Sequence, residues 1–103
     1  MKWYVKASSD RQYDVAIYLK GMHGPIGDKM VQHWALSSNS AENAKWFAVD
    51  ILEGMTVEEI FEDSNLPQSQ IDKVVNKYNL DYNNRIDYDL IPKIFNFDIF
   101  RIY

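Results

Sequence analysis

The chain has 103 residues with a net charge of −4, 47% apolar and 15% aromatic residues, and no cysteine. This composition predicts one folded domain with a packed core, and it excludes disulfides and thiolate metal sites. The start of the chain lacks the apolar segment of a signal peptide, and no apolar run is long enough to cross a membrane. We therefore expect a cytoplasmic protein that does not enter a membrane.

Alternating residues predict β-strands in the first third of the chain. The period is two in residues 2–7 and again in residues 13–20, and the polar segment SSDRQ between them predicts a hairpin. A third strand is expected at residues 30–37, after the glycine-rich loop GMHGPIGD. Residues 1–37 are thus the predicted β part of the domain.

From residue 40 onward the apolar period becomes that of a helix. An apolar stripe runs from Ala44 to Leu52, and Ser40 is the predicted N-cap in front of it. Thr56 and Glu59 have the spacing of a capping box, which predicts the start of a second helix.

The end of the chain is predicted to add a third helix and a strand. Pro67 suits the first turn of that helix, and the helical part is expected to span residues 40–95. The tail FDIFRIY, residues 97–103, has β character and is expected to form an edge strand. The order predicts an α+β fold in one domain, residues 1–103, with three or four antiparallel strands and helices on one face.

Residues 57–78 resemble a helix-turn-helix. Asn65 takes the turn position that is usually glycine, and Leu66 supplies the apolar residue after it. Phe61 and Ser64 depart from the pattern, which usually has a small and an apolar residue there. The resemblance implies that five side chains of the second helix would face the major groove of DNA: Gln68, Ser69, Gln70, Lys73 and Lys77.

Acidic residues are concentrated just before this unit. Residues 40–66 carry seven Asp or Glu against one Lys, which opposes docking on phosphates. Such a face suits a basic partner instead, because carboxylates compete with phosphate for Lys and Arg. Trp46 lies one step off the apolar stripe, so it is expected to be partly exposed and to anchor a protein interface. The predicted partner-binding residues are Trp46, Glu53, Glu58, Glu59, Glu62 and Asp63.

Patterns typical of catalysis or cofactor binding are missing from the sequence. His23 and His33 lack the spacing of metal ligands, and no serine lies in a Gly-x-Ser-x-Gly elbow. The loop GMHGPIGD lacks the Gly-Lys-Ser/Thr ending of a phosphate-binding loop. We therefore expect no enzyme, no metal and no cofactor.

Frequent Asn, Asp, Ile, Lys and Tyr, together with the helix-turn-helix-like segment, make the chain resemble small acidic proteins of phages and mobile elements. These include anti-CRISPR inhibitors of host defence. The resemblance implies a stoichiometric inhibitor of a basic or nucleic-acid-binding host protein, such as a Cas nuclease, in the bacterial cytoplasm. Two alternatives stay open on sequence alone, a helix-turn-helix DNA-binding regulator and a structural or oligomerisation module.

Overall fold

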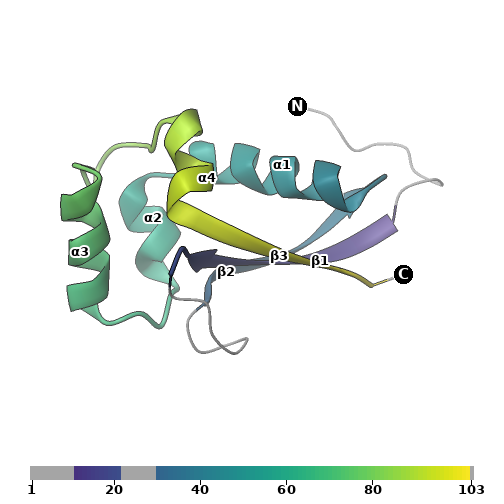
Figure 1. Ribbon diagram of the computed structural model, residues 1–103, viewed down its shortest axis with the longest axis horizontal. Coiled ribbons are helices and arrows are strands. Elements are labelled where there is room, and N and C mark those ends of the chain that lie inside the picture. Colours follow the sequence, from purple (N-terminus) through teal and green to yellow (C-terminus); the bar gives the residue numbers. More distant parts are fainter. Residues whose placement is uncertain (1–10, 22–29, 103) are drawn as a thin grey trace.

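The computed structural model describes residues 11–21 and 30–102 and has an α+β fold in which helices cover an antiparallel sheet (Figure 1). The sheet order is β2-β1-β3, and its strands are β1 (Arg11–Leu19), β2 (Met30–Ser38) and β3 (Phe95–Arg101). The strands predicted at residues 13–20 and 30–37 are therefore confirmed, and the tail does return to the sheet. The strand predicted at residues 2–7 and most of the glycine-rich loop lie outside the described residues.

Four α-helices and one 3₁₀ turn lie between β2 and β3 in the chain. α1 lies along one face of the sheet, while α2 and α3 gather at the end where β1 finishes and β3 begins (Figure 1). The elements are α1 (Ala41–Glu53), α2 (Val57–Glu62), α3 (Gln68–Lys77), the 3₁₀ turn η1 (Tyr88–Leu90) and α4 (Ile91–Ile94). In the part of the chain that the structure describes, no helix is both long and apolar enough to span a membrane.

Local capping explains where the first two helices begin. The Ser40 side chain accepts a hydrogen bond from the backbone N–H of Asn43 at 3.1 Å, which satisfies one of the free donors of α1. Both bonds of the capping box between Thr56 and Glu59 are present at the start of α2. Pro67 occupies the N-cap position of α3 rather than its first turn.

The core lies between the helices and one face of the sheet. Alternate residues of β1, among them Val15 and Ile17, are fully buried on this face. α1 brings Ala48 and Leu52 against them, and the small alanine lets the helix backbone approach closely. Each large apolar side chain buried in this way contributes roughly 1.5–3 kcal/mol to folding.

α2 is attached to the sheet by both an aromatic contact and a hydrogen bond. The rings of Phe61 and Phe95 have centroids 6.1 Å apart, and Gln32 of β2 donates to the carbonyl of Ile60 at 2.8 Å. Phe61, which departs from the helix-turn-helix pattern, is thus needed in this core. The six residues of α2 and their packing on the sheet do not confirm a helix-turn-helix unit.

Asn65 takes a turn position that is usually glycine, but its backbone is not left-handed. Among the described residues other than glycine, only Asn79 has a positive φ, 56°. It follows the C-cap of α3, and the N–H of Leu80 bonds the carbonyl of Val75 at 2.8 Å, as in a Schellman motif. The turn before α3, which contains Asn65, is therefore built without a left-handed residue, and this backbone geometry ends α3 instead of preceding it.

Candidate functional site

Positive charge is concentrated in one place on the described surface. Residues 11–21 and 30–102 contain thirteen Asp or Glu and eight Lys or Arg. Four of these eight cations line a single pocket of about 380 Å³, which we call the lysine pocket: Lys20, Lys73, Lys77 and Lys93. Outside the lysine pocket, the described residues therefore include four cationic and thirteen acidic side chains.

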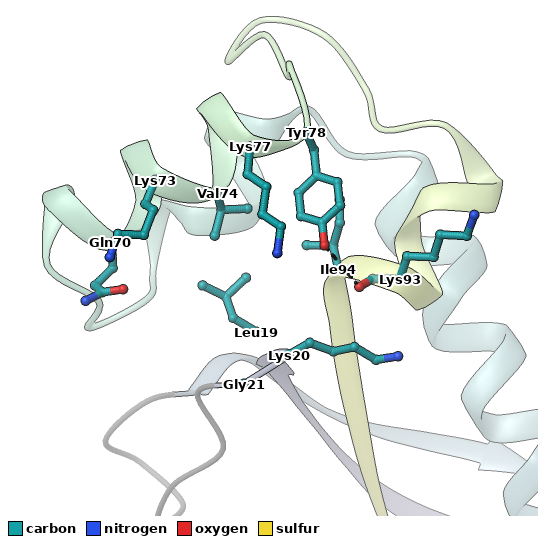
Figure 2. A pocket seen from close by; sticks show the side chains of 10 residues that line it. All are labelled: Leu19, Lys20, Gly21, Gln70, Lys73, Val74, Lys77, Tyr78, Lys93 and Ile94. Atoms are coloured by element: carbon teal, nitrogen blue, oxygen red, sulfur yellow. Dashed lines mark hydrogen bonds between the residues drawn. The ribbon is translucent and has the colours of Figure 1, made fainter.

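The lysine pocket lies between the end of β1, one face of α3 and the end of α4 (Figure 2). Its α3 wall is formed by residues three and four apart, which share one helix face. Its floor is apolar and comes from all three elements. The floor residues are Leu19, Val74 and Ile94.

Backbone and ring contacts hold the walls of the lysine pocket together. The N–H of Lys20 donates to the carbonyl of Ile94 at 2.8 Å, which joins β1 to α4. Tyr78 Oη donates to the carbonyl of Lys93 at 3.5 Å, and Lys77 Nζ lies 5.4 Å from the centroid of the Tyr78 ring. Lys77 extends from α3 into the space above Leu19 (Figure 2). The pocket walls are thus joined by a backbone hydrogen bond, a bond from a tyrosine hydroxyl and a contact between a lysine and an aromatic ring.

Carboxylates do not neutralise this pocket within the described residues. None of its described lining residues is acidic, and none of its four lysines forms an ion pair with a described carboxylate. A smaller hollow of about 170 Å³ shares Lys20 and adds Lys45. All five described lysines therefore line one of these two adjoining hollows.

The structure divides the five side chains that were expected to face DNA. Gln70, Lys73 and Lys77 lie together in the lysine pocket. Gln68 instead donates from Nε2 to Asp72 Oδ1 and to Tyr82 Oη, each at 3.0 Å, on another side of α3. Ser69 is exposed. The helix therefore presents a basic side and an acidic side.

Trp46 is part of an aromatic pair bordered by acids, which we call the acidic aromatic face. Its ring stacks on Tyr88 with centroids 6.2 Å apart and an angle of 12°, and its Nε1 donates to Glu42 at 2.9 Å. Tyr88 is 39% exposed. Its pKa is raised by burial of the phenol, then by the charge of Asp50 and a hydrogen bond with it. Glu53 and Asp89 add smaller effects of the same sign.

The other acids predicted to bind a partner lie around different features. Glu58 and Glu62 line a hollow of about 210 Å³ beside Tyr82. Glu59 accepts the capping-box bond at the start of α2, and Asp63 lines a hollow of about 240 Å³ beside β2. Only Glu53 of the predicted acids lies near the Trp46–Tyr88 pair.

The sequence did not predict Tyr88, Asp50 and Asp89 as members of one partner-binding face, nor Lys20 and Lys93 as members of one pocket with Lys73 and Lys77. Asp50 lies four residues after Trp46, and this helical spacing was the available signal. Nothing local connects Lys20 with Lys93, because their proximity depends on the pairing of β1 with β3.

The described residues contain no group of three or more His, Asp or Glu side chains placed to hold a metal ion. His33 Nε2 lies 3.6 Å from Asp14 Oδ1 on the neighbouring strand. His23 lies outside the described residues. Comparison of the chain with known protein families, curated proteins and solved structures finds no match.

Proposed function

We propose that this chain is a non-enzymatic, phage-encoded inhibitor that binds a basic or nucleic-acid-binding host protein, in the manner of anti-CRISPR proteins. The observation that carries the proposal is the stacked pair of Trp46 and Tyr88 bordered by the carboxylates of Asp50, Glu53 and Asp89. Such a partner, a Cas nuclease for example, has Lys and Arg where it holds nucleic acid.

The two parts of the acidic aromatic face have different physical roles in this proposal. Stacked aromatic rings give a rigid apolar contact, and Trp and Tyr are enriched among the residues that dominate interface energies. The carboxylates raise the association rate with a basic surface and occupy the cations that would otherwise bind phosphate. The acidic excess outside the lysine pocket extends this field over the described surface.

The proposal is tested by capture of host proteins on the immobilised chain. We expect the wild type to retain a nucleic-acid-binding protein, to release it when duplex DNA is added, and to inhibit its nucleic-acid binding. A triple variant of Asp50→Lys, Glu53→Lys and Asp89→Lys should lose this partner.

A second triple variant makes the same charge change on α2, with Glu58→Lys, Glu62→Lys and Asp63→Lys. If the acidic aromatic face is the interface, this variant should retain most of the binding. Equal loss in both variants would indicate net charge rather than a defined face. Recovery of no protein partner, together with tight binding to duplex DNA, would contradict the proposal.

A DNA-binding regulator is the second candidate, because Gln70, Lys73 and Lys77 of α3 share one pocket with two further lysines. Affinity for duplex DNA should then fall steeply with rising salt, and Lys73→Gln should reduce that slope. The internal bonds of Gln68 and the carboxylate of Asp72 on the same helix weigh against this candidate.

A further inference from the structure

The lysine pocket is not used by the proposed inhibitor surface. We propose that it binds a free nucleoside phosphate, with the phosphates held by the lysines and the base lying on the apolar floor. Its volume of about 380 Å³ falls in the range of roughly 300–1,000 Å³ that is typical of small-ligand pockets.

The charges of the pocket define the anionic half of this ligand. Lys20, Lys73, Lys77 and Lys93 come from three separate elements and line one concavity, with no acidic residue among its described lining. Lys77 extends into this space, whereas the ammonium groups of the other three lie at its edges (Figure 2). Uncompensated cations in a concave site raise the local concentration of anions. Lysine is a common phosphate ligand, and its flexible stem lets the ammonium groups at the edges turn toward a group that carries several negative charges.

The floor of the pocket defines the other half of the ligand. Leu19 and Ile94 are each only 2% exposed, so the apolar surface that a ligand can cover comes from Val74 and the ring of Tyr78, both of which are half-buried. A nucleobase is planar, covers such a floor and has polar edges. Gln70 at the rim carries an amide that can both donate to and accept from such an edge.

The aromatic wall also suits a base. Tyr78 is half-buried, and its hydroxyl lies 3.5 Å from the carbonyl of Lys93, to which it donates. Lys77 already lies 5.4 Å from the centre of this ring. A base packed beside Tyr78 would therefore bring its attached phosphates within reach of Lys77.

Duplex DNA fits this pocket less well than a free nucleotide. The outer surface of a duplex offers phosphates and sugars, and its bases are stacked inside, so Val74 and the ring of Tyr78 would remain uncovered. A single strand could place one base in the pocket, and the experiment separates that case from a free nucleotide.

The test is titration calorimetry at low salt with ADP, GDP, CDP and UDP as probes, beside adenosine and inorganic pyrophosphate. We expect saturable one-to-one binding of at least one diphosphate. Adenosine and pyrophosphate should each bind at least about tenfold more weakly, because each provides only half of the contacts.

Two variants locate the binding. The double variant Lys77→Gln/Lys93→Gln should weaken binding at least about tenfold, since it removes two charge-assisted contacts. Val74→Glu should abolish binding by placing a carboxylate on the floor. The control Arg85→Gln/Arg101→Gln makes the same charge change away from the pocket and should bind as the wild type does. Circular dichroism and thermal unfolding show whether each variant is folded.

Three outcomes would overturn the inference. These are no saturable binding of any of the four diphosphates up to about 1 mM, equal loss in the control variant, or binding of oligothymidylate without binding of free diphosphates. The result is separable from the inhibitor proposal, because Lys77→Gln/Lys93→Gln leaves the acidic aromatic face intact and should still capture the host partner.

Discussion

Tyr82 Oη donates a hydrogen bond of 2.6 Å to Asp72 Oδ1 and so ties the segment after α3 back onto that helix. Gln68 Nε2 reaches the same carboxylate oxygen and the Tyr82 oxygen, each at 3.0 Å. The bond from Tyr82, followed by that from Gln68, lowers the pKa of Asp72, because both stabilise the carboxylate. The same bond to Asp72 raises the pKa of Tyr82.

The first prediction concerns this pair. Tyr82→Phe should raise the pKa of Asp72 toward its ordinary value of 3.8. Because the folded-state pKa is depressed, the stabilisation by Asp72 is present above about pH 4 and is lost as pH falls through the folded value. The difference in stability between wild type and variant should therefore shrink in acid.

The measurement is the chemical shift of the Asp72 carboxyl carbon across the acid range, with urea unfolding at each pH. Tyr78→Phe is the matched control, since the Tyr78 hydroxyl bonds a carbonyl and not a carboxylate. Identical titration of Asp72 in wild type and Tyr82→Phe would show that the hydrogen bond does not control this pKa.

The second prediction concerns Asn79, which ends α3 at φ 56°. This conformation destabilises a residue that has a Cβ by roughly 1–2 kcal/mol, and the destabilisation is smaller for Asn than for most residues. Asn79→Ala should thus lower the free energy of unfolding by about 1 kcal/mol, whereas Asn79→Gly should leave it unchanged or raise it. Urea unfolding with equal m-values measures both. Equal effects of Ala and Gly would mean that the left-handed backbone is not what the position requires.

Local sequence rules predicted the elements that depend on near neighbours. Ser40 begins α1 and Thr56 with Glu59 begins α2 as expected, because a cap involves residues only three positions apart. The same rules do not distinguish Asn65 from Asn79, since both positions follow a helix and tolerate left-handed backbone, but only Asn79 adopts it.

Contacts between distant segments could not be predicted in this way. Lys20 and Lys93 meet because β1 pairs with β3, and a helical wheel of α3 shows only Lys73 and Lys77. The stacking of Trp46 on Tyr88 likewise needs η1 to return to α1. The sequence pattern therefore predicted the layers of the fold, while the sites depend on how the layers meet.

The third prediction concerns the capping box of α2. Thr56→Ala removes the acceptor for the N–H of Glu59, a bond of 3.2 Å, and should reduce the free energy of unfolding by about 1 kcal/mol. Thr56→Ser keeps the hydroxyl and should retain most of that stability. Thermal unfolding of the two variants measures the contrast. A loss in Thr56→Ser as large as that in Thr56→Ala would assign the effect to packing of the methyl group instead.

The fourth prediction concerns the titration of Tyr88 in the acidic aromatic face. Its pKa is raised above 10.0 by burial, and then by Asp50, Glu53 and Asp89. A raised folded-state pKa favours the neutral phenol, so its stabilisation is complete below about pH 10 and is lost as pH rises through the folded value. Asp50→Asn should lower the pKa of Tyr88, because it removes the nearby charge.

Carbon NMR of ring-labelled tyrosine follows this titration, and Trp46 fluorescence reports the same event through the stacked ring. Tyr88→Phe keeps the stacking surface without an ionisable group, so its Trp46 signal should not change in this alkaline range. Glu62→Gln is the matched control for Asp50→Asn, since it removes one negative charge beside Tyr82. If Asp50→Asn leaves the pKa of Tyr88 unchanged, burial with the charges of Glu53 and Asp89 raises it, and Asp50 is free to pair with a basic partner.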